Sequence, residues 1–579
     1  MNKRPMVAIK ELFIKLLASL KRFPEVILLA TAVVITLIFL NHLGYSDPAA
    51  FRNHLTKLAM VLALGIPLFL SVKLIFERLP DLKSWLKATL YLAVIIGLIL
   101  YYLFGLKKLV MVPVTRYIAL TIAFYSMFLF IPCFFKRKNF EIYCVHLLTG
   151  LAITYFYAAV LYLGLSAMLF TVSKLFLIKL GKVYFDIWLA VAGIFAPAYF
   201  LADLPAIKKE LQVESFSKVL KILLLYIVIP MIAVYSMILY VYFAKIIITR
   251  VWPAGIVSHL VLWYSLLSNI VFFMVYPLRN DLKWLAKCIA YFPKIILPLL
   301  AMMFVSMGIR VHAYGVTESR YFVLLAGLWV SGWMLYYLFT NRVRNIILPI
   351  SLTIIAILSV IGPWSAFAVS KFDQNSRLTA ILKKYNMLQG QALVKPNRPI
   401  SATDKAQIIS VLSYFKDSHS LGDADYLPDH FKLSEMPKIF GFKWNPDSNY
   451  QSYFNYQFVN NRNTELTDIQ GFDYFIKITQ TDITKNNPDK RLRISYSLER
   501  HELKITAHDQ EIYKKRVSDL VIPLFKKRIS PGEEAVHCLD ETAKVKVFYE
   551  FDTISGQTDP ATDEMNINYM NFEAFIKLK

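Results

Sequence analysis

The chain has 579 residues, of which 57% are hydrophobic and 15% aromatic, and its mean hydropathy is +0.48. This composition excludes a wholly soluble protein and indicates an integral membrane protein. The formal net charge of +24 at pH 7 would suggest a nucleic-acid-binding protein if it were spread over a soluble surface.

The basic excess lies in the apolar part of the chain. Residues 1–370 carry 35 Lys and Arg against 12 Asp and Glu, whereas residues 371–579 carry 29 against 28. The charge therefore follows membrane topology, because Lys and Arg favour cytoplasmic loops. The C-terminal part is nearly neutral, so we expect no nucleic-acid partner.

Apolar runs long enough to cross a bilayer recur from Ile27 to Ala368. Each membrane helix needs about 20 mostly apolar residues, because its backbone N–H and C=O groups must pair within the segment. By this rule we predict about eleven spans. They are Glu25 to Asn41, Leu58 to Phe76, Ala88 to Phe104, Tyr117 to Phe134, Tyr143 to Thr171, Ile187 to Ala202, Leu220 to Phe243, His259 to Leu278, Cys288 to Gly308, Tyr321 to Thr340 and Ile346 to Ala368.

Basic residues favour one set of alternate loops, which includes the N-terminus and the run Lys136-Arg137-Lys138. This asymmetry predicts a cytoplasmic N-terminus. With an odd number of spans, the C-terminal domain is then extracytoplasmic. The segment from Tyr143 to Lys179 is long enough to hold two spans, and in that case the domain would lie in the cytoplasm.

The chain turns polar after Ser370, which predicts two domains. Residues 1–370 form a polytopic α-helical transmembrane domain, and residues 371–579 form an extracytoplasmic α+β domain. Two helices are predicted near Ser376 to Leu388 and Thr403 to Phe415, the second capped by Ser401 or Thr403.

Strand patterns fill the rest of this domain. Leu492, Ile494, Tyr496 and Leu498 alternate with polar residues, and Leu503 with Ile505 follows a short polar turn, which predicts a hairpin. The same period of two occurs from Val545 to Phe551 and around Phe472 to Ile478. We therefore predict a mainly antiparallel sheet.

Cysteine usage argues against a metal site. Of Cys133, Cys144, Cys288 and Cys538, only the last falls in the soluble domain, so no disulfide can form within it. Neither a CxxC pair nor a Cys/His spacing typical of zinc occurs. The sequence predicts no metal and no cofactor, and it names no catalytic residue.

Three segments are predicted to meet the same outer membrane surface: 252–255, 310–321 and 362–365. Arg offers paired donors to an anionic group such as a lipid phosphate, so these segments form a hypothetical substrate-binding site for membrane lipids. Its residues are Trp252, Arg310, His312, Tyr314, Glu318, Arg320 and Trp364. The alternative is an interfacial belt of aromatic residues with one Arg/Glu pair.

Several of these segments resemble a family. The stretch from Ile229-Pro230 to Trp252-Pro253-Ala254-Gly255, the segment Arg310 to Tyr321 and Gly362-Pro363-Trp364-Ser365-Ala366-Phe367 are similar to bacterial multipass membrane proteins grouped as domain of unknown function 4153. The resemblance covers about residues 20 to 390, and more loosely Leu388-Gln389-Gly390 and Ile400 to Tyr414. It implies a bacterial inner-membrane protein and transfers no catalytic residue.

Three functions stay open at this point. The first is envelope transport or lipid handling, with the outer cluster binding the substrate. The second is a membrane enzyme acting on lipid-linked substrates, similar in plan to polyprenyl-sugar-dependent glycosyltransferases, with Asp47 in the first outer loop as the acidic residue. The third is a sensory or scaffolding protein that binds an envelope protein partner through its C-terminal domain.

Overall fold

The structure is a computed structural model, and the chain divides into two compact units. One unit holds Met1–Ala380 with Tyr414–Leu427, and the other holds Ile381–Ser413 with Pro428–Lys579. The structure describes residues 14–44, 48–134, 140–176, 178, 180–205, 216–250, 256–340, 343–390, 392–428, 430–444, 452–457, 469–479, 483–487, 492–526, 536–558 and 565–579.

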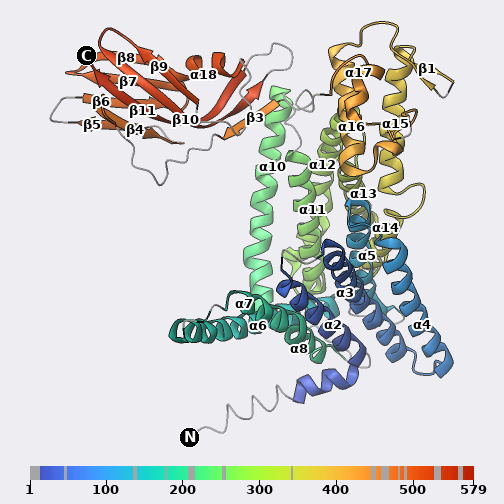
Figure 1. The fold of residues 1–579 in the computed structure, drawn as a ribbon. Helices are drawn as coiled ribbons and strands as arrows, with labels where there is room; N and C mark the ends of the chain where they lie inside the picture. Colours follow the sequence, from blue (N-terminus) through green and yellow to red (C-terminus); the bar gives the residue numbers. More distant parts are fainter. Residues whose placement is uncertain are drawn as a thin grey trace. The chain divides into compact units, whose positions relative to one another are not determined.

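The first unit is a bundle of long apolar helices (Figure 1). Ten helices among the described residues are long and apolar enough to span a membrane, which confirms the polytopic prediction. Five of them are α2 (Pro24–His42), α3 (Ala49–Arg78), α6 (Phe140–Phe176), α12 (Lys283–Tyr314) and α13 (Glu318–Phe339). The other five each join two segments: α4 (Ser84–Leu100) and a π-helical turn at Tyr101–Gly105, α5 (Met111–Phe130) and a 3₁₀ turn at Ile131–Cys133, α7 (Gly181–Ala190) and α8 (Ala196–Ala202), α9 (Lys218–Ile222) and α10 (Ile229–Thr249), and α11 (Ile256–Val275) and a 3₁₀ turn at Tyr276–Asn280.

Local irregularities sit inside several spans without ending them. π-helical turns at Val191–Phe195 and Leu223–Val228 join α7 to α8 and α9 to α10. Pro67 lies inside α3, and Pro293 with Pro298 lies inside α12. Membrane helices tolerate such residues because neighbouring groups and small helical adjustments satisfy the freed backbone atoms.

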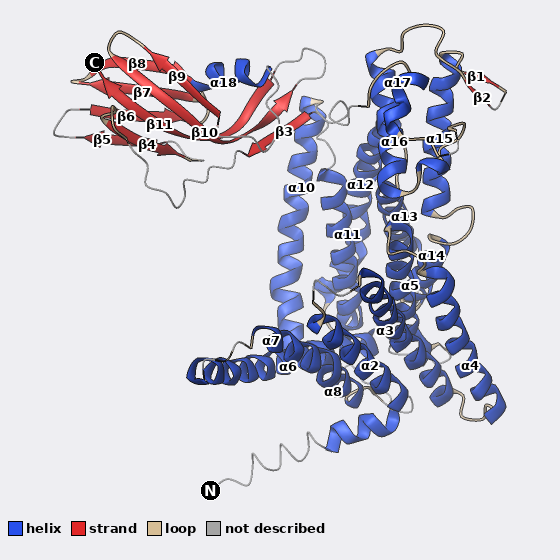
Figure 2. Cartoon of the chain, viewed as in Figure 1, coloured by secondary structure: helices blue, strands red, loops and turns tan. Residues whose placement is uncertain are grey.

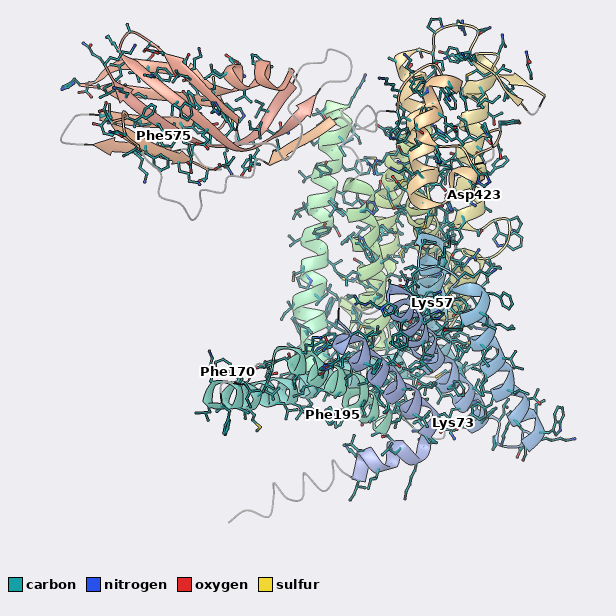
Figure 3. The ribbon with its side chains drawn as sticks, viewed as in Figure 1. Lys57, Lys73, Phe170, Phe195, Asp423 and Phe575 are labelled. Atoms are coloured by element: carbon teal, nitrogen blue, oxygen red, sulfur yellow. The ribbon has the colours of Figure 1, made fainter. Side chains whose placement is uncertain are left out.

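Helix α6 runs without a break for 37 residues. The segment from Tyr143 to Lys179 therefore contributes one long helix, not two spans. At about 1.5 Å per residue it is longer than a bilayer core is thick. Its C-terminal half is apolar and exposed, as at Phe170, which is 56% exposed (Figure 3). Such an all-apolar exposed helix suits contact with lipid.

The predicted eleventh span, Ile346 to Ala368, is wrong in length. Helix α14 (Ile347–Leu358) has only 12 residues, because Gly362 adopts a positive φ of 87° and Pro363 lacks an amide hydrogen. The short helix still runs antiparallel along α5: Thr353 Oγ1 donates to the carbonyl of Ala123, and Arg116 Nε donates to that of Val360. The described chain therefore has ten helices long enough to span a membrane, and α14 is a shorter apolar helix packed beside α5.

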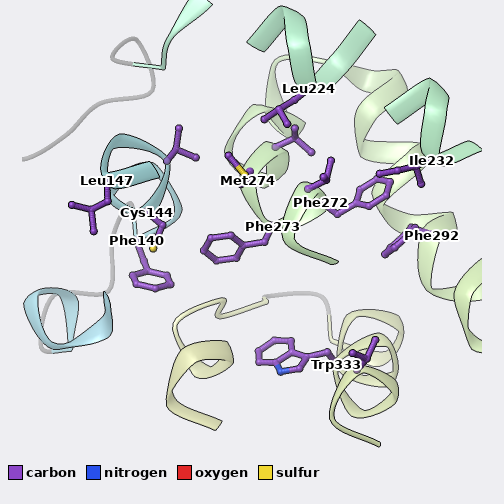
Figure 4. Packing of buried hydrophobic residues seen from close by; sticks show 14 of the residues in the cluster. Phe140, Cys144, Leu147, Leu224, Ile232, Phe272, Phe273, Met274, Phe292 and Trp333 are labelled. Carbon is purple, nitrogen blue, oxygen red and sulfur yellow. The ribbon is translucent and has the colours of Figure 1, made fainter. Parts of the chain in front are cut away.

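One apolar cluster holds much of this bundle together (Figure 4). The rings of Phe272 on α11 and Phe292 on α12 stack with centroids 3.9 Å apart. Phe140 of α6 meets Phe273 of α11 edge to face at 5.8 Å. Helices α11, α12 and α13 pack against one another, so the ends of α12 and α13 are held side by side.

Two helices follow the bundle. Helix α15 (Ala366–Lys384) begins ten residues before the predicted Ser376, and α16 (Ala402–Ser418) covers the second predicted helix. Ser401 Oγ accepts a hydrogen bond from the Asp404 amide at 3.2 Å, which confirms Ser401 as a capping residue. A two-stranded ladder of β1 (Leu388–Gln389) and β2 (Ala392–Leu393) follows α15, and α17 (Met436–Ile439) is a single turn.

The second unit contains two larger antiparallel sheets where one was predicted (Figure 2). The first has the order β3-β10-β11-β4, with β9 also paired to β10, and the second has the order β5-β6-β7-β8. The strands are β3 (Ser452–Gln457), β4 (Tyr474–Ile478), β5 (Ile483–Asn487), β6 (Leu492–Ser497), β7 (Glu502–Ala507), β8 (Gln510–Arg516), β9 (Val536–Glu541), β10 (Val545–Thr558) and β11 (Met565–Leu578).

Both sheets and helix α18 (Val517–Lys526) contribute to a single apolar core. The predicted hairpin is β6 with β7, where Ile494 pairs with Ile505. The alternating residues Val545, Val547 and Tyr549 are fully buried, as the period of two requires. The predicted α+β character of the C-terminal part is thereby confirmed.

Candidate functional site

The sequence-predicted site lies around the connector between α12 and α13, residues 315–317. Helix α12 ends at Gly315, whose φ of 75° and ψ of 177° are open essentially only to glycine. Arg320 folds back from α13, and its Nη1 donates to the carbonyls of Tyr314 at 3.1 Å and Gly315 at 2.5 Å. The Arg320 guanidinium also lies 5.6 Å from the centroid of the Tyr314 ring.

Helix α15 clamps the same connector from a distant part of the chain. Arg377 donates to the carbonyls of Val311 at 3.0 Å and Ala313 at 3.2 Å, and to that of His312. These are the last carbonyls of α12, where a cation is favoured by the negative end of the helix dipole. Asp373 Oδ2 accepts the amide of Val316 at 2.7 Å.

Gln374 is the third residue of α15 that binds the connector. Gln374 Nε2 donates to the carbonyl of Val316 at 3.0 Å and to that of Tyr314 at 3.3 Å. The backbone polar groups at this helix end are thus satisfied by side chains of α15. The connector is therefore pre-organised by its neighbours.

Glu318 does not pair with an arginine. It is the first residue of α13, and its Oε1 accepts the hydroxyl of Tyr414 at 2.7 Å and lies 2.6 Å from His419 Nε2. The side chains of His419 and Glu318 are only 2% and 8% exposed. Burial, together with the hydrogen bond to the Glu318 carboxylate, raises the pKa of Tyr414 well above its usual value. These contacts of Glu318, Tyr414 and His419 join the start of α13 to the end of α16.

The other predicted residues fall into three groups. Arg310 is half-buried on the last turns of α12, with no hydrogen bond or ion pair to any described residue. The side chains of His312 and Trp364 are exposed, and Trp364 contributes its carbonyl, which accepts the hydroxyl of Tyr321 at 2.7 Å. Trp252, with the rest of 252–255, lies outside the described residues.

The Arg/Glu pair of the alternative interpretation does not form with Glu318 among the described residues, because Glu318 contacts Tyr414 and His419, and this changes the local charge. Three guanidinium groups lie near the connector: Arg310 is on the last turns of α12, Arg320 donates to the Gly315 carbonyl, and Arg377 donates to the last carbonyls of α12. Asp373 is the acidic side chain that contacts this group, 3.6 Å from Arg377. With the Glu318 carboxylate occupied by Tyr414 and His419, the arginines at the connector outnumber the carboxylates.

Sequence reasoning missed the residues that hold the site. They are Asp373, Gln374, Arg377, Tyr414 and His419. One signal was present: Asp373 and Arg377 stand four residues apart directly after the last apolar run, a spacing that pairs opposite charges on one helix face. Nothing in the sequence linked that helix to the end of α12.

Within the described part of the chain, no group of three or more His, Cys, Asp or Glu side chains could hold a metal ion. The four cysteines are free. What the described site offers chemically is hydrogen-bond donors and positive charge, a set suited to binding an anion.

These features define the class: a polytopic α-helical membrane protein with a β-rich C-terminal unit. The model of the family called domain of unknown function 4153 matches residues 26–394, and the chain belongs to this family. It is also 23% identical over 279 residues to an uncharacterized protein of Pasteurella multocida (strain Pm70). That alignment covers 48% of this chain and 47% of the relative, so the chain spans about half the length of that protein. No solved structure matches.

Proposed function

We propose that this protein serves lipid handling in the bacterial cell envelope, by binding the anionic group of a lipid or lipid-linked substrate at the α12–α13 connector. The observation that carries the proposal is the excess of arginine side chains at the connector, because the Glu318 carboxylate contacts His419 and not an arginine. A guanidinium forms paired hydrogen bonds with phosphate, and a site at the end of two spans is within reach of lipid headgroups.

Arg310 and Arg320 have donors left for such a ligand. The protein hydrogen bonds of Arg320 both come from Nη1, which leaves Nε and Nη2 without a partner among the described residues. The Arg310 guanidinium makes no hydrogen bond to the described part of the chain. The exposed Trp364, at 55%, and Tyr314, at 56%, suit the apolar boundary of a headgroup region.

Arg310 provides the sharper test, because its side chain makes no hydrogen bond or ion pair among the described residues. Purified full-length protein would be examined by native mass spectrometry for retained phosphatidylglycerol, alongside an envelope-sensitivity assay in cells that lack the native gene. We expect Arg310→Ala to insert normally but to retain less phosphatidylglycerol than the wild type and to lose function, and Arg310→Lys to restore both only in part, since the bidentate fork is lost.

Lys108→Ala is the matched control, because Lys108 is exposed and its replacement also removes one positive charge. Its lipid retention and phenotype should equal those of the wild type. If Arg310→Ala also retains wild-type lipid and restores envelope resistance, the site and the proposed function fail together.

A further inference from the structure

A separate cavity opens at the far end of α13, where α14 begins. It has a volume of about 150 Å³ and is lined by Phe134, Arg344, Ile346, Ile347 and Ile350. Four of these side chains are apolar, and Arg344 contributes the cationic group. The volume is well below the roughly 300–1,000 Å³ of a typical small-molecule site, so the cavity fits a segment of a chain-like ligand.

Hydrogen bonds of Arg344 and its neighbour Asn345 fix the backbone beside the cavity. Asn345 is 2% exposed, and its Nδ2 donates to Glu141 Oε1 at 2.5 Å while its Oδ1 accepts the hydroxyl of Tyr337 at 2.5 Å. The amide of Arg344 donates to the hydroxyl of Tyr336 at 3.0 Å. Residues 344 and 345 are thereby tied to the last turns of α13 and the start of α6, so the lining residues are held in place.

The position matches a membrane boundary. Helix α13 spans from Glu318 to Phe339, and α14 starts at Ile347, so Arg344 lies between the ends of two apolar helices. Arg344 is exposed, and its side chain has no partner among the described residues.

We propose that this cavity binds one anionic phospholipid, with its phosphate on Arg344 and the first methylenes of an acyl chain between Phe134, Ile346 and Ile350. The apolar walls match the chain, and the guanidinium matches the phosphate. This site is independent of the proposed function, because Arg344 follows the end of α13 whereas Arg320 lies at its beginning.

Native mass spectrometry of the full-length protein in detergent tests the headgroup. The probes are phosphatidylglycerol, phosphatidylcholine and inorganic phosphate. We expect Arg344→Ala to lower phosphatidylglycerol occupancy by roughly tenfold, the scale of one lost charge-assisted hydrogen bond, and Lys83→Ala to leave it unchanged. Equal retention of the two lipids, binding of inorganic phosphate alone, or an Arg344→Ala variant that behaves like Lys83→Ala would each overturn the proposal.

A second pair of variants tests the chain-binding part. Ile350→Trp fills the cavity without changing charge, whereas Ile354→Trp lies one turn further along α14, outside the lining, and is 52% exposed. We expect Ile350→Trp to lose phosphatidylglycerol and Ile354→Trp to keep it. Lipid loss in Arg310→Ala combined with full retention in Arg344→Ala and Ile350→Trp would reject this cavity while supporting the connector site.

Discussion

Gly315 is the residue on which the connector's hydrogen bonds depend. A Cβ atom there would lie 2.6 Å from Asp373 Oδ2 and Gln374 Nε2 and 2.8 Å from Arg377 Nε, and its φ of 75° is strained for any other residue. We expect Gly315→Ala to destabilise the protein by about 2 kcal/mol or more and to lower its melting temperature in detergent.

Gly308 on the same helix is the control. A Cβ atom added there meets no atom within 4 Å, so Gly308→Ala should be neutral or slightly stabilising. If the two variants have the same melting temperature, the clamp on the connector does not hold the structure as described.

The buried trio of Glu318, Tyr414 and His419 gives a second residue-scale prediction. Glu318→Ala removes the buried carboxylate that accepts from Tyr414 and lies against His419, so we expect a cost of about 3 kcal/mol, against about 1 kcal/mol for Tyr414→Phe. The loss should appear as a lower melting temperature and earlier proteolysis near α16.

Asp417→Ala provides the comparison, because Asp417 is exposed on the same helix. It should leave stability unchanged. A double-mutant cycle between Glu318 and His419 that shows no coupling would refute the tie between α13 and α16.

At the scale of elements, the start of α16 is joined to the end of α15 by Asp404. Its Oδ2 accepts Lys384 Nζ at 2.7 Å, the Tyr385 hydroxyl at 2.6 Å and Ser401 Oγ at 2.7 Å. Burial by itself would raise the pKa of Asp404, but these hydrogen bonds outweigh it and hold the pKa below its usual value. The carboxylate is therefore favoured in the folded state.

The sign of the pH effect follows from this depressed pKa. The stabilisation by Asp404 is present above the ordinary carboxyl pKa of about 3.9 and is lost as the pH falls through the lower folded value. We expect Asp404→Asn to melt earlier than the wild type at pH 6, and the difference to shrink below about pH 4. A difference that stays constant from pH 6 to pH 3 would contradict the assignment.

At the scale of the whole molecule, the basic-loop asymmetry predicts a cytoplasmic N-terminus. If α14 crosses the membrane together with the ten long helices, the number of crossings is odd and the C-terminal unit is extracytoplasmic. The burial that raises the pKa of Cys538 makes this native thiol a poor reporter. A cysteine introduced at the exposed Lys544 in a cysteine-free background should react with a membrane-impermeant maleimide in spheroplasts, and one at Lys83 should not. The reverse labelling pattern would place the C-terminal unit in the cytoplasm.

Local signals accounted for much of the architecture. A membrane helix pairs its own backbone groups, so apolar length alone located the ten long helices. The β6–β7 hairpin and the cap at Ser401 also depend on neighbours in sequence. Gly362 and Pro363 are residue types that end helices. The apolar residues on both sides of them nevertheless led to the prediction of one long span.

Tertiary structure decided the partners within the candidate site. Glu318 and His419 are 101 residues apart, and Arg377 reaches a carbonyl 66 residues away, so neither contact leaves a local pattern. The cavity at Arg344 likewise depends on how α14 packs along α5. Helix formation is set by interactions within a few residues, whereas a binding site is set by which helix ends pack together, and the sequence by itself determined only the former.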